Sequence, residues 1–324
     1  MRLADAVLQQ CFHRSSIELN LNPARDADLI GYQQFDTIQS SWKIKLYFLF
    51  IFCLAISSTI HAQEYASAEE LRFVTTNSEF TLLHEMGHLL IHELKLPVLG
   101  REEDAADQLG FIGLFLIYDR QQTPDFPMRL LDVADYWRLE WQRAKQPEEE
   151  IYAWDSHALD EQRFYNIACL AYGSDPKNLE WIIEMTGLPE ERAFYCQDEY
   201  EQAVHAALWF REHFKRSAQQ PIEHRIQVIY ETPPQHLEGG SDLLERVKAS
   251  GELEAVAKRA SEFFALPRDL TLRVKSCGAP DSWYNTISGE LTLCYERIAH
   301  FKKLARKLPR LNPAAAENQT QSSH

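Results

Sequence analysis

The sequence predicts an α+β fold that is predominantly α-helical and carries a small cysteine-bracketed β-hairpin. Apolar residues recur at helical spacing over most of the chain. Leu270 to Val274 alternates as a strand, and Leu291 to Cys294 forms a second strand after the turn Asn285 to Gly289. Cys277 and Cys294 bracket this hairpin. With 324 residues and 45% hydrophobic content, the chain can build one large domain or two small ones.

The first predicted helix begins at Ser67, which forms a capping box with Glu70. Its apolar stripe runs through Leu71, Val74, Leu82, Met86 and Leu89. Pro97 and Gly100 end this helix. A second helix follows, with acidic residues in its first turn and an apolar run behind them. Further helices are predicted at Asp132 to Ala144, around Cys169, at Glu190 to Phe214, at Asp242 to Phe264 and after Cys294.

The first helix contains the sequence His84-Glu85-Met86-Gly87-His88, an HExxH motif. Residues four apart share a helix face, so both imidazoles can bind one metal ion while Glu85 faces the water bound to it. This pattern is typical of zinc peptidases. On the motif alone, the alternative is a helix with two partly buried histidines and a solvated glutamate, since the string arises by chance in roughly one chain of this length in a hundred.

A catalytic zinc ion needs a third protein ligand, and the start of the second helix offers a candidate. The string Glu103-Asp104-Ala105-Ala106-Asp107 has the form ExxAD, which resembles the third-ligand motif of the gluzincin peptidases. The resemblance implies that Glu103 is the third ligand, that Ala106 packs closely against the first helix and that Asp107 holds a ligand histidine. The alternative is that acidic residues favour the positive end of any helix dipole.

His92 lies on the same helix face as His84 but is too distant to be a ligand of the same ion. Eight residues separate the two histidines by about 12 Å, whereas each ligand atom must lie roughly 2.1 Å from the metal. We expect His92 to be a partly buried structural residue or a group that contacts a ligand.

The net charge of -15 and the pI near 5.3 argue against a nucleic-acid partner, which calls for a basic surface. The dense basic stretch from Lys302 to Arg310 is interpreted as a solvated helix face. The expected partner is a peptide or protein substrate, because peptide-bond hydrolysis is the reaction that an HExxH zinc site performs most readily.

An uncharged apolar segment, residues 46–60, follows Lys43 and Lys45 and precedes Ala62. The basic flank, apolar core and small residues at its end indicate a secretory signal peptide, or an uncleaved anchor. The run is short of the about 20 residues that a membrane span needs, and a buried core helix is the alternative. We expect an exported protein, periplasmic or extracellular, that associates with the membrane through residues 46–60 if this segment is retained.

These features divide the chain into five segments. Residues 1–41 are predicted to be an N-terminal extension, disordered or preceding the true start, and residues 42–62 the signal peptide or signal anchor. Residues 63–232 form the helical core with both motifs, and residues 233–311 form a helix and hairpin module that completes the domain. Residues 312–324 are predicted to be a disordered tail.

Four cysteines follow the signal segment: Cys169, Cys196, Cys277 and Cys294. They permit three pairings. We favour the local pairs Cys169 with Cys196 and Cys277 with Cys294, whose closed loops would each contribute about 3 kcal/mol. Free buried thiols are the alternative.

Beyond the single motifs, the sequence resembles a family of exported bacterial metallopeptidases that is catalogued mainly as a domain of unknown function. The resemblance covers residues 70–305 and rests on the segments His84–His88, Leu96–Gln108, Asp160–Asn166 with Cys169, Leu266–Leu270 with Cys277-Gly278, and Cys294–Glu296. It implies a zincin-like metallopeptidase domain. In the family the cysteine hairpin precedes the HExxH helix, whereas here it follows, as in a circular permutation or a broken or fused reading frame. The family's Asn-Ala-Phe-Tyr string is also replaced by Asp281-Ser282-Trp283-Tyr284.

The leading hypothesis is a zinc-dependent peptidase with about one zinc ion per chain, held by His84, His88 and Glu103. Glu85 would accept the proton of the attacking water and pass it to the leaving amine. Two other functions stay open. One is an exported, metal-stabilised module that binds peptides without cutting them, and the other is a zinc amidohydrolase that acts on a non-peptide amide.

Transition-state stabilisation has three candidates in a polar turn and the helix that follows it. His157, Arg163 and Tyr165 could reach the developing oxyanion if the turn folds over the metal. For Arg163 and Tyr165 the alternative is a role in helix packing. We favour His157 as the catalytic residue.

Overall fold

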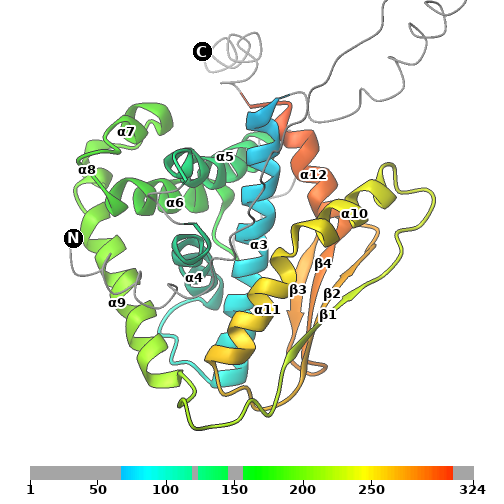
Figure 1. Cartoon of the computed structure of the whole chain (residues 1–324). Coiled ribbons are helices and arrows are strands. Elements are labelled where there is room, and N and C mark those ends of the chain that lie inside the picture. Colours follow the sequence, from blue (N-terminus) through cyan, green and yellow to red (C-terminus); the bar gives the residue numbers. More distant parts are fainter. Residues whose placement is uncertain (1–66, 119–122, 145–155, 309–324) are drawn as a thin grey trace, which may run out of the picture. The chain divides into compact units, whose positions relative to one another are not determined.

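A long helix, α3 (Ala68–Leu94), divides its contacts between a group of helices and a small sheet (Figure 1). The computed structural model describes residues 67–118, 123–144 and 156–308. The predicted extension, signal segment and tail therefore lie outside the described residues. Within the described ranges, no helix combines the length and hydropathy that a membrane crossing requires.

Both ends of α3 follow from the sequence. The hydroxyl of Ser67 accepts a hydrogen bond from the backbone N–H of Glu70 at 3.2 Å, which caps the start of the helix as predicted. At the other end, Lys95 takes a left-handed conformation, and Leu96 donates its N–H to the Ile91 carbonyl. Pro97 then prevents the helix from continuing.

The helical group packs on one side of α3. Its members are α4 (Glu102–Ile117), α5 (Phe126–Ala144), α6 (Asp160–Ser174), α7 (Trp181–Thr186), α8 (Glu190–Ala193) and α9 (Cys196–Phe214). Helices α4 and α5 contact α3, α6 packs on α5, and α9 packs on α6. The predicted helix from Glu190 to Phe214 is interrupted at Phe194 and Tyr195, and the short helix α7 was not predicted.

A disulfide joins α6 to α9 where the two helices approach most closely. Cys169 is bonded to Cys196, and a Cβ atom on Gly173 would lie only 2.0 Å from the Cys196 carbonyl oxygen. Only glycine fits at position 173 without moving the backbone. The second predicted disulfide, between Cys277 and Cys294, is also present, so both predicted pairings are confirmed.

The sheet has the strand order β1-β2-β4-β3. Its strands are β1 (Ile226–Tyr230), β2 (Leu270–Lys275), β3 (Ser282–Asn285) and β4 (Glu290–Cys294). Strands β1, β2 and β4 are parallel, and β3 runs antiparallel to β4 at the edge. The helices α10 (Gly240–Ser250) and α11 (Glu252–Phe263) connect β1 to β2, and α12 (Tyr295–Ala305) follows β4.

The prediction that the strands near Leu270 and Leu291 pair as the hairpin is wrong. Both strands exist, but they are parallel neighbours, and the hairpin consists of β3 and β4. The chain returns from the end of β2 through β3, a four-residue strand that lacks a long alternating pattern and was not predicted. The Asn285 side chain organises the turn between β3 and β4 by accepting the N–H groups of Ile287 and Ser288 at 3.0 Å.

The predicted helix from Asp242 to Phe264 is two helices, because Gly251 adopts φ 65° between them. A hydrophobic core joins α3 to the sheet and to α9, α10 and α11, and its most buried members include Leu82, Leu89, Leu272, Val274, Leu291 and Tyr295. The mainly helical α+β class, with a small sheet and a hairpin that lies between two bonded cysteines, is confirmed.

Candidate metal centre

Small residues allow α3 and α4 to cross at very short distance. A Cβ atom on Gly87 would lie 3.2 Å from the Cα of Ala106, and one on Gly110 would lie 3.1 Å from the backbone nitrogen of His84. Ala106 is fully buried in this crossing. The close approach brings the first turn of α4, with Glu103, next to the HExxH face of α3.

Three side-chain atoms converge at this crossing. The Nε2 atoms of His84 and His88 are 3.2 Å apart, and each lies 3.3 Å from Oε2 of Glu103. Ligand atoms at roughly 2.0 to 2.1 Å from one tetrahedral zinc ion lie about 3.3 to 3.4 Å from each other. The observed triangle therefore has the dimensions that a tetrahedral metal ion requires.

The carboxylate of Glu103 supplies a second indication of a metal ion. Its Oε2 atom is buried, and among the described residues no donor meets it with hydrogen-bond geometry, although three histidine nitrogens lie within 3.3 Å. Burial raises the pKa of Glu103, but the contacts with His157, His84 and His88 outweigh burial and hold the pKa well below its usual range. A half-buried, ionised carboxylate beside two imidazoles is a suitable donor set for a divalent cation.

Asp107 holds His84 from the side opposite the triangle. Its Oδ1 atom lies 2.9 Å from Nδ1 of His84, and Arg163 donates to both carboxylate oxygens at 2.8 and 2.5 Å. Burial raises the pKa of Asp107, but the adjacent Arg163 and His84 lower it below its ordinary value. The guanidinium of Arg163 also stacks 3.5 Å from the ring centre of Trp137. Arg163 thus takes a packing and charge-pairing role, and Tyr165 packs beside the Cys169–Cys196 disulfide.

Glu102 holds the other histidine of the motif and was not identified from the sequence. Its Oε1 atom lies 2.7 Å from Nδ1 of His88 and 3.0 Å from Nε2 of His92. His92 is 43% exposed and is joined to His88 through this carboxylate. It is not a member of the compact group that could hold a metal ion. Glu102 is the first of three consecutive acidic residues, so its position in the sequence does not distinguish it from Glu103 or Asp104 as a partner of His88.

A cavity of about 700 Å³ opens onto the triangle. Its walls come from α3, α4, α5, the turn before α6, the β3 strand and α12, and they include Glu85, His157, Tyr136, Trp283, Tyr284 and Arg297. The hairpin thus lies along the same cavity as the HExxH motif.

Glu85 and His157 both line this cavity, in different settings. Glu85 is buried, and burial raises the pKa of its carboxyl group more than the neighbouring histidines lower it. His157 is 47% exposed, and its Nε2 atom lies 3.0 Å from Oε2 of Glu103. His157 does not belong to the compact three-residue group. His157 lines the cavity and contacts the triangle directly through Oε2 of Glu103.

Arg268 fixes the hairpin against α3. Its guanidinium contacts the Glu93 carboxylate at 2.6 and 3.0 Å and donates to the backbone carbonyls of Thr286 and Ile287 at 2.6 and 3.0 Å. The hydroxyl of Tyr284 donates to the same glutamate. Since Glu93 is on the helix that carries the HExxH motif, this network sets the distance between β3 and the triangle.

The ligand set formed by an HExxH helix and a glutamate of the next helix is that of metallopeptidases of the HExxH class. The chain matches a family model described as "DUF4344: Putative metallopeptidase" over residues 40–210 and 234–323. It belongs to that family. No curated protein and no solved structure matches the chain. The altered order of the hairpin and the helix, predicted from the sequence, stays a prediction.

Proposed function

We propose that the protein is a zinc-dependent peptidase in which His84, His88 and Glu103 hold the metal ion and Glu85 is the general base. The observation that carries this proposal is the triangle of ligand atoms, with separations of 3.2 to 3.3 Å. The family description supports the same reaction class.

When bound, a zinc ion supplies Lewis acidity, which polarises a scissile carbonyl and lowers the pKa of water. Glu85 takes the proton of the attacking water and delivers it to the leaving amine. Its burial favours this role, because a raised pKa makes a carboxylate a stronger base. His157 donates a hydrogen bond to the developing oxyanion from the cavity wall.

The edge strand β3 supports a peptide as the substrate. It is at the end of the sheet order and supplies Ser282, Trp283 and Tyr284 to the cavity. An extended peptide can add to a sheet edge through backbone hydrogen bonds. We place the activity outside the cytoplasm, which the two disulfides support.

The test compares the parent protein with Glu85→Gln for zinc content and for cleavage of a peptide library. We expect about one zinc ion per chain in both proteins and at least a hundredfold slower cleavage by the variant, since removal of a general base costs roughly 10² to 10⁴ in rate. Glu69→Gln is the matched control, because Glu69 is exposed in the first turn of the same helix.

Each outcome discriminates between functions. Absence of zinc from the purified protein contradicts the metal site, and equal cleavage by parent and Glu85→Gln contradicts the base. Zinc that raises the melting temperature without any cleavage indicates the non-catalytic module. The amidohydrolase is indicated if the protein binds zinc and leaves the peptide library uncleaved, yet hydrolyses another amide in a reaction that requires Glu85.

A further inference from the structure

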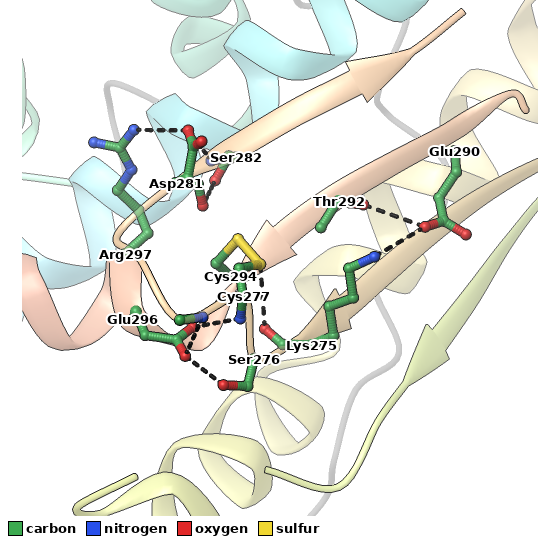
Figure 2. Close-up of a disulfide and its surroundings, with 11 residues drawn as sticks. Lys275, Ser276, Cys277, Asp281, Ser282, Glu290, Thr292, Cys294, Glu296 and Arg297 are labelled. Atoms are coloured by element: carbon green, nitrogen blue, oxygen red, sulfur yellow. Dashed lines mark hydrogen bonds and ion pairs between the residues drawn. A yellow bond between two sulfur atoms is a disulfide. The ribbon is translucent and has the colours of Figure 1, made fainter. Parts of the chain in front are cut away.

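One arginine in the cavity, Arg297, has no hydrogen-bonded carboxylate among the described residues. The Nη1 atom of Arg297, on α12, donates to the hydroxyl of Tyr136 at 2.7 Å, and Tyr136 is neutral. Its Nη2 atom is 3.9 Å from Oδ1 of Asp281, beyond hydrogen-bond distance. Its buried Nε atom has no hydrogen-bond partner among the residues that the structure describes. Figure 2 shows the side chain of Arg297 directed toward Asp281.

The other two arginines of the cavity wall are fully engaged with carboxylates. Arg163 forms two short hydrogen bonds to Asp107, and Arg101 forms two with Asp104. In the part of the chain that the structure describes, Arg297 has no comparable partner, because Asp281 is 60% exposed and accepts the backbone N–H of Ser282 at 2.8 Å. An ion pair of this length with so exposed a carboxylate contributes little.

Arg297 is held in position from two sides. Tyr136 is buried on α5 and fixes one edge of the guanidinium. Arg297 is also three residues beyond Cys294, whose disulfide to Cys277 ties the start of α12 to the end of β2 (Figure 2). The result is a positioned guanidinium that lines the same cavity as Glu85. Guanidinium groups bind carboxylates with two parallel hydrogen bonds and are weakly hydrated, which suits this role.

We propose that Arg297 binds a carboxylate of the substrate, so that the protein prefers peptides with a carboxylate close to the scissile bond. This inference rests on the proposed peptidase function. The carboxylate is either the C-terminal group of a short peptide or the side chain of an aspartate or glutamate. In either case it displaces the weak contact with Asp281, and Tyr136 acts as a positioning residue.

The experiment measures kcat/KM for three peptides of one sequence, which differ only in the carboxylate. The first has a free C-terminus, the second is amidated, and the third is amidated with a glutamate in place of a glutamine beside the scissile bond. Charged hydrogen bonds contribute enough for the parent to prefer a carboxylate-bearing peptide by about ten- to hundredfold. The first and third peptides show which carboxylate is recognised.

Two substitutions have opposite expected effects on this preference. Arg297→Gln removes it, whereas Asp281→Asn increases it, because the competing carboxylate is lost. The double variant Asp281→Asn with Arg297→Gln shows no preference. Asp242→Asn, on the exposed surface of α10, changes the net charge by the same amount and sign as Asp281→Asn and serves as its control, with an unchanged preference.

The outcomes separate this inference from the proposed function. Equal preference in parent and Arg297→Gln, or a reduced preference in Asp281→Asn, overturns the role of Arg297 while peptide cleavage persists. If the parent cleaves no peptide, the proposed function fails, and calorimetric affinities of Glu85→Gln for the acid and amide peptides still test Arg297. If Arg297→Gln does not fold, the preference of Asp281→Asn still tests the inference, because Asp281 is exposed and its substitution should not disturb folding.

Discussion

Asp107 has two partners, His84 and Arg163, and thereby links Arg163 to a proposed metal ligand. The carboxylate of Asp107 contacts Nδ1 of His84, and the guanidinium of Arg163 forms an ion pair with the same carboxylate. The resemblance of the ExxAD string to the gluzincin motif implied the contact of Asp107 with His84, whereas the contact of Asp107 with Arg163 was not predicted. Glu102, Tyr136 and Arg297 were not predicted as site residues. The packing of separate elements against one another brings these three residues to the cavity, and no spacing in the sequence indicates such packing.

The variant Asp107→Asn tests the support of the metal ligand. The amide keeps the size of the side chain but removes the charge that His84 and Arg163 share. Carboxylates that orient ligand imidazoles contribute about ten- to hundredfold to metal affinity, so we expect a loss of that size. Competition with a chromophoric zinc chelator measures it, on protein whose folding is checked by circular dichroism.

Asp104→Asn is the matched control for this measurement. Asp104 is in the same helix turn, but its carboxylate pairs with Arg101 on the exposed surface. We expect its zinc affinity to equal that of the parent. An unchanged affinity in Asp107→Asn would show that Asp107 serves the packing of α4 and not the metal ligand.

Glu79 gives the protein a pH-dependent stability that is independent of the metal. Burial raises the pKa of its carboxyl group from 4.5 to about 7, against the lowering effects of the Tyr118 hydroxyl and Arg129. Between these two pH values the folded protein binds a proton that the unfolded chain has released. Stability therefore falls as the pH rises from 4.5 to about 7, by at most about 3 kcal/mol.

Urea unfolding of the parent and of Glu79→Gln at pH 5 and pH 8 measures this contribution. We expect the parent to lose more stability than the variant over this range. Glu184→Gln, at an exposed position on α7, should lose as much as the parent. Parallel pH profiles for parent and Glu79→Gln would contradict the assignment.

At the scale of elements, the crossing of α3 and α4 determines whether the triangle forms. Gly110 faces the backbone of His84, which cannot move aside, whereas Gly113 faces the flexible end of the Leu83 side chain. Both glycines lie on α4, so an alanine at either position gains the same helix propensity. The two positions therefore form a matched pair.

We expect Gly110→Ala to weaken zinc binding by at least tenfold and to lower the free energy of unfolding by about 1 kcal/mol, because overpacking forces the helices apart. Gly113→Ala should be neutral or slightly stabilising. Zinc competition and thermal unfolding measure both effects. Equal zinc affinities in the two variants would show that the crossing tolerates an added methyl group.

The helices were more predictable than the sheet. The helix α3 has a cap, a periodic apolar stripe and a terminating proline in consecutive sequence, so its bounds could be predicted. Strands β2 and β4 pair directly in the sheet although β3 separates them in the sequence, and no local pattern records this pairing. The strand β1 was missed for the same reason, since its partner β2 is more than forty residues further along the chain.

At the scale of the whole molecule, the Cys169–Cys196 disulfide stabilises the helical group apart from the metal site. It closes a loop with a sequence separation of 27 residues, which corresponds to about 3 kcal/mol of loop entropy. Replacement of both cysteines by serine should lower the melting temperature by roughly 10 °C, measured by scanning calorimetry. We expect the zinc content to stay at that of the parent, because the ligands come from α3 and α4. Equal melting temperatures would contradict this prediction.

The Cys277–Cys294 disulfide lies beside the first turn of α12, which carries Arg297 (Figure 2). It ties the end of β2 to the start of α12, and so to Arg297, whereas the triangle depends on noncovalent packing between α3 and α4 (Figure 2). A reducing environment would therefore loosen the wall that selects the substrate and leave the ion in place. In a reducing compartment the proposed metal ligands would stay in place while the cavity lost selectivity, so this disulfide would support selectivity as well as stability.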